Sequence, residues 1–327
     1  MNKDIKPLII TNQNWNKDDL TPSITIITPV FNRRNTIKRA IDSVERQTFR
    51  NIEYIIIDDG SSDPIDDIIE EYMRISSLPV MFIKKQNGGV HTARNMGYKY
   101  ARGVLVLNVD SDDEILPNGC EIFWEEWEKI PKDQIKHYWQ MKAQCCNQDG
   151  IMTGTLFPDN INELPIKEAW VHFSLSHGDQ SGCRVTSIMK ENLFPEPEGV
   201  TFVSENILWI PLERKYKSWG INRVTDVVHT DGDDHLSRVH KKTLQTCRNS
   251  MWNAMFEINH KNTYILDFKT HFRILFRYCI MEKILFSEDP RFVENNRLLG
   301  WKNNLLRTVL WIPSMLGAYL YRKTRMT

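Results

Sequence analysis

Short apolar runs alternate with amphipathic stretches through the first 110 residues. The runs "SITIITPVF", "YIIIDD", "VMFIKK" and "GVLVLNVD" are rich in β-branched residues and contain or end in polar residues, a pattern typical of buried strands. The segments between them, residues 35–47, 64–75 and 88–101, place apolar residues on one helical face. Strands alternating with helices predict an α/β fold with a Rossmann-like, mostly parallel central sheet flanked by helices.

Polar residues gather where these strands end. Ligands of such sheets bind beyond the carboxyl ends of the strands, which meet at one edge. Residues 29–32, 58–62, 84–89 and 110–114 follow the predicted strands, and each stretch contains Asp, Asn or Gly. We therefore expect these loops to converge on one binding crevice.

The stretch "VDSDDE" bunches acids at the end of the last of these strands. Carboxylates this close repel each other unless a cation lies among them. Asp110 and Asp112 offer oxygen ligands of the kind that Mg²⁺ or Mn²⁺ prefers. The alternative is that residues 112–114 cap a helix that begins near Leu116.

Two further loops carry residues suited to a nucleotide. Asp59 can accept bonds from a ribose or a base, and Gly60 permits a tight turn. Gly88 and Gly89 lead into a helix whose amides can face an anion, and Arg94 follows within two turns. No G-x-G-x-x-G and no G-x-x-x-x-G-K-[ST] motif occurs in these loops, which counts against dehydrogenases and P-loop kinases.

Residues 23–131 resemble the donor half of the family-two inverting glycosyltransferases. The similarity lies in "TIITPVFNR…IKRAIDSVERQTFRNIEYIIIDDGSSD", "KKQNGGVHTARNMGYKYARG" and "LNVDSDDE", in order and at the family's spacing. It implies a GT-A fold, a nucleotide-diphosphate sugar donor, a divalent ion (Mn²⁺ or Mg²⁺) and a role in bacterial surface-polysaccharide assembly. Uridine diphosphate hexoses, including N-acetyl forms, are the donors that it favours.

The resemblance also assigns residues. It implies nucleoside contacts for Pro29, Asn32 and Asp59, a ribose or metal contact for Asp110, metal and diphosphate contacts for Asp112, and a diphosphate contact for Arg94. The predicted donor-binding set also contains their neighbours Val30, Gly60 and Ser111. One departure is that Arg33 and Arg34 stand where many members have Glu.

An inverting transferase needs a base that deprotonates the attacking hydroxyl. Many relatives use a Glu-Asp pair that opens a helix, and here the pair reads Glu205-Asn206. Glu205 is therefore the predicted catalytic base, unless it is only a first-turn acid beside Ser204. Asp179, in "SHGDQSG", is the alternative base or an acceptor-binding residue.

The segment "VVHTDGDDHLSR" brings histidines close to acids. His229 or His235 can supply a third metal ligand, or the segment can form a lid over the donor. The alternative is a solvated loop.

Composition places limits on partners and location. Lys and Arg number 42, as do Asp and Glu, so the net charge of zero does not indicate a nucleic-acid partner. The six cysteines form no C-x-x-C pair, and the first residues lack a secretory apolar segment. Both features favour reduced thiols and a cytoplasmic location.

The C-terminal region has a different character. Residues 291–327 carry seven Lys or Arg and one Glu, and Thr308–Leu320 is an uncharged run of thirteen residues interrupted by Pro313. This run is too short to span a bilayer. It either lies on the anionic inner face of the cytoplasmic membrane or forms a helix packed on the core.

Together these patterns predict the organisation of the chain. We expect a leader at residues 1–22, a donor-binding half at 23–131, an acceptor-binding and catalytic half at 132–240, and a helical, basic extension at 241–327. The expected activity is transfer of one sugar to a hydroxyl of a glycan acceptor, lipid-linked if the membrane interpretation holds. The rival functions are a sugar nucleotidyltransferase, whose Gly-rich first loop is missing here, and a non-catalytic scaffold.

Overall fold

The computed structural model describes residues 6–15, 21–230, 243–260 and 268–325. The chain divides into two compact units. One contains residues 1–193 and 212–232, and the other contains residues 194–211 and 233–327. We refer to them as the sheet unit and the helical unit.

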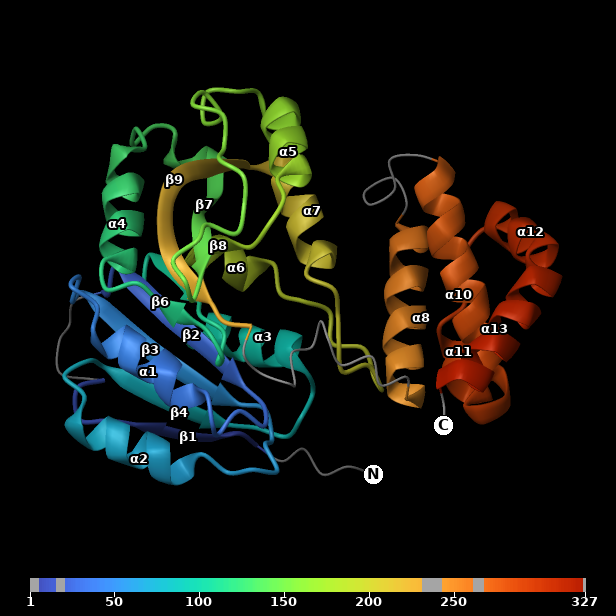
Figure 1. Cartoon of the computed structure of the whole chain (residues 1–327), viewed down its shortest axis with the longest axis horizontal. Coiled ribbons are helices and arrows are strands. Elements are labelled where there is room, and N and C mark those ends of the chain that lie inside the picture. Colours follow the sequence, from blue (N-terminus) through green and yellow to red (C-terminus); the bar gives the residue numbers. More distant parts are fainter. Residues whose placement is uncertain (1–5, 16–20, 231–242, 261–267, 326–327) are drawn as a thin grey trace. The chain divides into compact units, whose positions relative to one another are not determined.

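A mixed sheet forms the centre of the sheet unit (Figure 1). Its strand order is β1-β4-β3-β2-β5-β8-β7-β9-β6. The parallel part consists of β2 (Ile24–Val30), β3 (Ile52–Asp58), β4 (Val80–Lys84) and β5 (Leu105–Asn108). The remaining strands are β1 (Leu8–Thr11), β6 (Glu114–Ile115), β7 (Tyr138–Asn147), β8 (Gln180–Val185) and β9 (Lys217–Val228).

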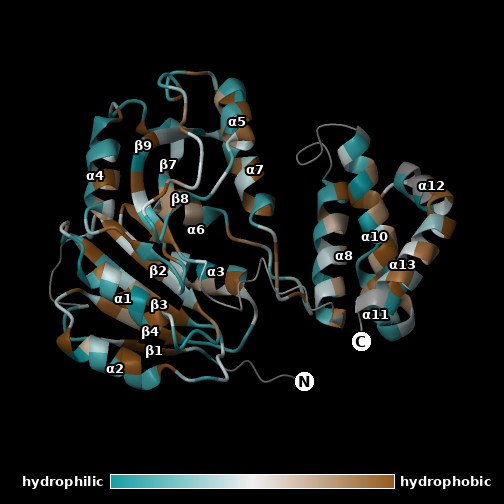
Figure 2. Ribbon diagram, in the orientation of Figure 1, coloured by the Kyte–Doolittle hydropathy of each residue, from teal (hydrophilic) through white to brown (hydrophobic). Residues whose placement is uncertain are grey.

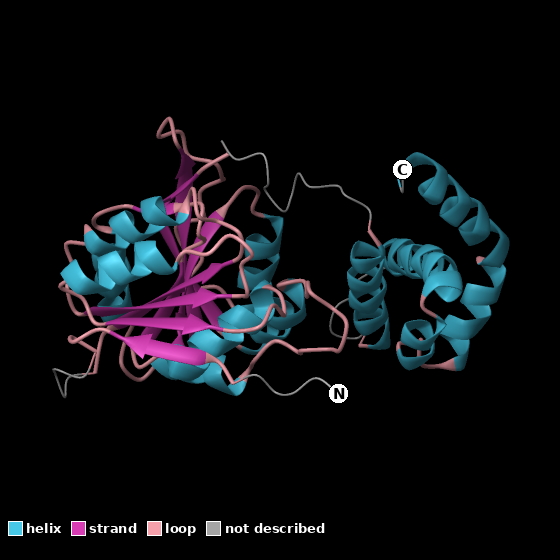
Figure 3. Cartoon of the chain, turned by 90° about the horizontal axis from the view of Figure 1, so that it is seen from below, coloured by secondary structure: helices cyan, strands magenta, loops and turns pink. Residues whose placement is uncertain are grey.

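Helices cover both faces of this sheet (Figure 3). The first face carries α1 (Ile37–Glu45), α2 (Asp66–Ile75) and α4 (Gly119–Lys129), whose apolar residues join one core with the strands. The opposite face carries α3 (Val90–Tyr100), where Gly97 packs directly on Ile27. The central strands are mainly hydrophobic along their length, as Figure 2 shows. The predicted α/β sheet flanked by helices is therefore confirmed.

Shorter elements complete the sheet unit. They are a 3₁₀ turn (Ile135–His137), α5 (Ile166–Leu175), α6 (Thr186–Glu191) and the end of α7 (Asn206–Lys215), a helix whose first residues belong to the helical unit.

Residues 1–22, expected to be a weakly patterned leader, contain a strand. β1 pairs antiparallel with β4, at the edge of the sheet. All four of its residues are exposed, so backbone hydrogen bonds rather than apolar burial hold it in place. Trp15 follows it, is buried, and lies under the guanidinium of Arg102, 4.1 Å from the ring centroid. A strand of four exposed residues leaves too little pattern for the sequence to reveal.

The helical unit is built around α10 (Phe268–Glu288). The other helices are α8 (Leu244–Asn259), α11 (Pro290–Asn295), α12 (Trp301–Val309) and α13 (Trp311–Arg325). Glu282 of α10 has a side chain only 2% exposed and forms two contacts with Arg307 of α12, at 2.9 and 2.7 Å. Within the described residues, every helix is too short or too polar to cross a membrane.

Candidate active site

Asn32 joins the loops that follow β2 and β3. Its backbone is left-handed, with φ of 53°, a conformation that Asn tolerates better than most residues. The side-chain Oδ1 accepts hydrogen bonds from the backbone N–H and the hydroxyl of Ser62, at 2.8 and 3.0 Å. Its own N–H donates to Ser61 Oγ at 2.9 Å. Two of the predicted loops are therefore tied together by one side chain.

Asp59 joins the loops that follow β3 and β4. It is buried, and its carboxylate accepts the N–H groups of Gly88 and Gly89 at 3.0 and 2.7 Å. The Nζ of Lys85 forms an ion pair with the same carboxylate and donates to Thr92 Oγ1 at 2.8 Å. Lys85 was absent from the predicted site, although its place directly after a strand was a signal. The carboxylate thus holds the glycine loop that leads into α3.

Other predicted residues shape the loops after β2 and β3 through their backbones rather than their side chains. Pro29 and Val30 are buried, and the carbonyl of Val30 accepts the N–H of Asp59 at 2.8 Å. Gly60 has φ of 75°, and a Cβ there would lie 2.7 Å from the backbone N of Asn87. This turn therefore requires glycine.

Arginines lie among the acids that follow β5. The buried Arg94 places Nη2 3.2 Å from Asp110 Oδ1, while the Asp110 side chain is 51% exposed. Arg33 Nε lies 3.6 Å from Asp112 Oδ2, and Arg39 donates to the backbone carbonyl of Asp112. Ser111, between the two acids, is buried. The repulsion between Asp110 and Asp112 is thus offset by protein cations, and the Arg33 contact was not expected from the sequence.

Asp113 and Glu114 face His229 at the end of β9. The N–H of His229 donates to Asp113 Oδ1 at 2.9 Å, and its Nε2 lies 2.9 Å from Glu114 Oε1. Burial raises the pKa of Asp113 to about 8, and the nearby charges of Asp110, Asp112 and Asp226 add to the increase. The alternative that these acids cap the next helix is wrong, because α4 begins at Gly119 and β6 intervenes.

The His229 side chain is only 12% exposed, so the expectation of a solvated loop is also wrong at this residue. His235 lies outside the described residues. Among the described residues, no group of three or more His, Cys, Asp or Glu side chains is arranged to hold a metal ion. Metal ligation by His229 therefore stays a prediction.

Asp179 lies at the same sheet edge as Asp110. It is exposed and immediately precedes β8, which pairs antiparallel with β5. Because the start of one antiparallel strand lies beside the end of its partner, Asp179 is placed near the carboxyl end of β5. All six cysteines are buried, and none forms a disulfide.

Glu205 belongs to the helical unit, directly before α7. It is exposed, and its Oε2 accepts the indole N–H of Trp209 at 3.2 Å. The adjacent Ser204 donates its N–H to Asn253 Oδ1 at 2.8 Å, while Asn253 Nδ2 donates to the carbonyl of Phe202 at 2.9 Å. Asn253, a buried residue of α8, therefore fixes the backbone that carries Glu205.

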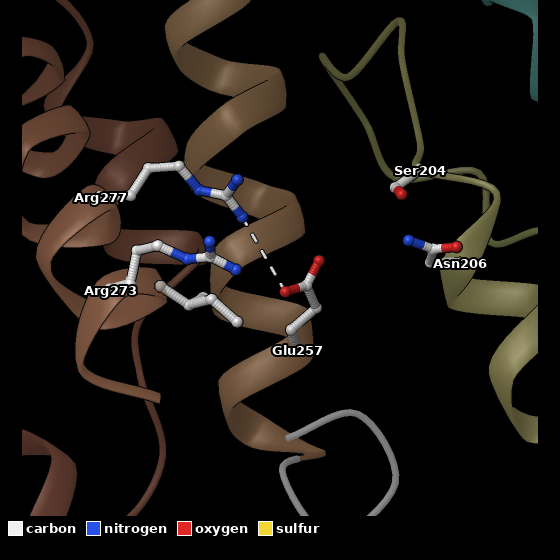
Figure 4. A pocket seen from close by; sticks show the side chains of 6 residues that line it. Ser204, Asn206, Glu257, Arg273 and Arg277 are labelled. Atoms are coloured by element: carbon white, nitrogen blue, oxygen red, sulfur yellow. Dashed lines mark ion pairs between the residues drawn. The ribbon is translucent and has the colours of Figure 1, made fainter. Parts of the chain in front are cut away.

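A polar pocket of about 510 Å³ adjoins this segment. Figure 4 shows Ser204 and Asn206 on one side and the side chains of Glu257, Arg273 and Arg277 on the other. Arg277 Nη2 lies 3.9 Å from Glu257 Oε2. Burial raises the pKa of Glu257, against the opposing effect of the two arginines. The pocket offers hydrogen-bond donors, an acceptor and positive charge within one unit.

Comparison with known proteins gives a consistent result. Residues 25–171 match the family described as Glycosyl transferase family 2. An uncharacterized glycosyltransferase of Rickettsia conorii is 32% identical over 214 residues, which cover 64% of this chain and 33% of that relative. The minor teichoic acid biosynthesis protein GgaB of Bacillus subtilis is 37% identical over 100 residues, 30% of this chain and 11% of that protein. The matches thus span a third or less of these two relatives.

Solved structures support the fold. TarS residues 1–349 of S. aureus give a TM-score of 0.53 at 17% identity and cover 91% of this chain and 80% of that one. The mannosyltransferase PcManGT of Pyrobaculum calidifontis gives 0.52 at 13% identity and covers 92% and 88%. The fold is therefore of the GT-A type, with helices added at the C-terminus. Residues 25–171 therefore form a domain that matches glycosyl transferase family 2, and the similarity to other glycosyltransferases supports this assignment.

Proposed function

We propose that the protein is an inverting glycosyltransferase that moves one sugar from a nucleotide-diphosphate donor to a hydroxyl of a glycan acceptor. The observation that carries this proposal is the junction of the loops after β2, β3 and β4 through Asn32 and Asp59. Beside them, Asp110 presents a half-exposed carboxylate supported by the buried Arg94. Such an edge of a parallel sheet is where nucleotides bind in α/β folds.

The donor in this proposal is a uridine diphosphate hexose such as glucose, galactose or an N-acetyl form. One TarS structure contains UDP-GlcNAc, and the PcManGT structure contains GDP-Man and Mn²⁺. Both complexes support a nucleotide-sugar donor for this fold. The resemblance of the "IDDGSSD" and "VDSDDE" motifs to the family favours uridine.

A divalent ion, Mn²⁺ or Mg²⁺, belongs to the same proposal. Carboxylates are the ligands these ions prefer, and the Asp110 and Asp112 side chains are 51% and 21% exposed. These residues fit the ion and would hold it. Once bound, it would neutralise charge on the diphosphate leaving group.

The base in this proposal is Glu205, with Asp179 as the alternative. Either carboxylate is exposed and can accept a proton from a hydroxyl. We further propose that the polar pocket beside Glu205 binds the acceptor. The similarity to GgaB, a minor teichoic acid biosynthesis protein, supports an acceptor in cell-surface glycan assembly. In this proposal the acceptor is a lipid-linked saccharide reached from the cytoplasmic side.

Calorimetric titration of uridine, guanosine and cytidine diphosphate sugars, each with Mn²⁺ and with chelator, tests the donor site. We expect metal-dependent binding of the uridine class. Release of nucleoside diphosphate on addition of an acceptor would support transfer, whereas release of pyrophosphate from a nucleoside triphosphate and a sugar phosphate would favour a nucleotidyltransferase. Absence of binding to every donor would contradict the proposal and favour a scaffold.

A further inference from the structure

Helices α12 and α13 are amphipathic in the reverse of the usual sense. Globular proteins normally bury the apolar face of a surface helix and expose the polar one. Here the residues that face α10 and α8 are small or polar. Ser314 and Ala318 are buried, a Cβ on Gly317 would lie 2.9 Å from Ile280, and the Tyr321 hydroxyl lies 3.8 Å from the Cys247 thiol.

The outward face is apolar instead. We call it the outer face, and it consists of residues that are 48% to 73% exposed: Leu305, Val309, Trp311, Ile312, Met315, Leu316, Tyr319 and Leu320. Residues 305 and 309 of α12, and residues 312, 316 and 320 of α13, follow the helical repeat, so each helix carries its own apolar stripe. Figure 2 shows hydrophobic residues along both helices. An exposed apolar face of this kind marks an interaction surface.

The segment that carries the outer face contains basic side chains but no acidic ones. No Asp or Glu follows Glu294, whereas residues 299–327 contain five Lys or Arg. One of these, Arg307, is engaged by Glu282. From α10, Lys283 adds an ammonium group 5.3 Å from the centroid of the Trp311 ring. An anionic lipid bilayer complements such a surface, because its hydrocarbon region accepts the apolar and aromatic side chains and its headgroups attract the basic ones.

We propose that the outer face is a monotopic membrane-binding surface that lies in the plane of an anionic leaflet. At 15 residues, α13 is too short to span the hydrocarbon core, so it lies along the surface. Trp311 and Tyr319 supply the aromatic rings that favour the headgroup level. A second copy of the chain is a poorer occupant, because a symmetric dimer would bring two surfaces of the same charge together.

This inference is independent of the donor site, which lies in the other unit. Its test uses the full chain and cosedimentation with vesicles of phosphatidylcholine alone or mixed with phosphatidylglycerol. The wild type should sediment with the mixed vesicles and much less with the neutral ones. The double variant Ile312→Glu with Leu316→Glu should lose at least roughly tenfold in vesicle affinity, because two exposed apolar side chains become anionic.

The matched control places the same substitutions on exposed apolar residues of the sheet unit. Ile75 and Leu175 are 68% and 65% exposed, at the ends of α2 and α5. Ile75→Glu with Leu175→Glu should leave vesicle binding unchanged, and circular dichroism and donor binding should show that both variants fold. Failure of the wild type to bind anionic vesicles would overturn the proposal. So would full binding by the outer-face variant, or a wild-type dimer that dissociates only in that variant while vesicles have no effect.

Discussion

Arg94 and Asp110 form an ion pair of unequal burial, in which a guanidinium 9% exposed supports a carboxylate 51% exposed. We expect Arg94→Ala to weaken donor binding by roughly tenfold to a hundredfold, since the acid loses a charged hydrogen-bond partner that orients it. Calorimetry with the donor measures this loss. Arg223→Ala is the control because Arg223 forms an exposed ion pair with Glu125 on another part of the sheet unit. Equal donor affinity in wild type and Arg94→Ala would contradict an orienting role.

Asp112 is the residue we expect to distinguish metal-dependent from metal-independent binding. Asp112→Ala should abolish the Mn²⁺-dependent part of donor affinity, because a carboxylate ligand is removed. Its thermal midpoint should stay close to that of the wild type, since the Arg33 contact is long at 3.6 Å. Asp42→Ala, at an exposed ion pair on α1, is the control. Unchanged metal dependence would rule out Asp112 as a ligand.

The two candidate bases can be separated by comparing binding with turnover. Glu205→Gln should retain donor affinity and lower transfer by roughly 10² to 10⁴, the range for removal of a general base. Asp179→Asn should then have a smaller effect on the rate constant. If the two results are reversed, Asp179 is the base. Asn253→Ala tests positioning, because it frees the Ser204 backbone without removing either carboxylate.

Substitution of Gly60 tests whether the turn between β3 and α2 requires glycine, and Gly150, which also has a left-handed backbone, is the comparison. Gly60 and Gly150 have φ of 75° and 76°, but only at Gly60 would a Cβ meet the chain, 2.7 Å from Asn87 N. Gly150→Ala should therefore cost about 1 kcal/mol, the penalty of the backbone conformation alone. Gly60→Ala should cost more and also reduce donor binding. Chemical denaturation measures both costs, and equal values would mean that the close approach has no effect.

The raised pKa of Asp226 leads us to expect that the free energy of unfolding depends on pH. Burial raises the pKa of this carboxyl group to about 6 in the folded protein. A raised pKa means that the stabilising effect of the bound proton is complete below about pH 4 and is lost as the pH rises to about 6. We expect Asp226→Asn to remove this loss, which amounts to at most about 3 kcal/mol. The comparison is urea unfolding from pH 4 to 7, with Asp149→Asn in an exposed turn as the control.

The parallel core of the sheet could be predicted because its strands are continuous apolar runs. The first residues of the helices were harder to predict from the sequence. Asn35 and Asp63 have the chemistry of caps, but α1 and α2 begin later, after Thr36 and Ile65, without a side-chain cap. Tertiary packing rather than capping therefore sets these starts.

The sequence predicted which loops form the site, but not the hydrogen bonds and ion pairs that connect them. Asn32, Asp59 and Asp110 could be named from the positions of the strand ends. The ion pairs of Lys85 and Arg33 could not be predicted, because their partners are distant in sequence and depend on the loop conformations. Glu205 could be named from the resemblance, but the contact that holds its segment could not, because Asn253 lies 49 positions from Ser204.

The ion pair between Glu282 and Arg307 also bears on how the chain is synthesised. Glu282 emerges from the ribosome 25 residues before the arginine that neutralises it. Breaking a buried ion pair by removing one partner costs ~3–5 kcal/mol, so we expect the packing of α10 to gain its full stability only after α12 has been translated. A chain that stops before residue 307 would therefore lack the arginine that neutralises Glu282, and we expect its helical unit to be less stable than that of the full chain.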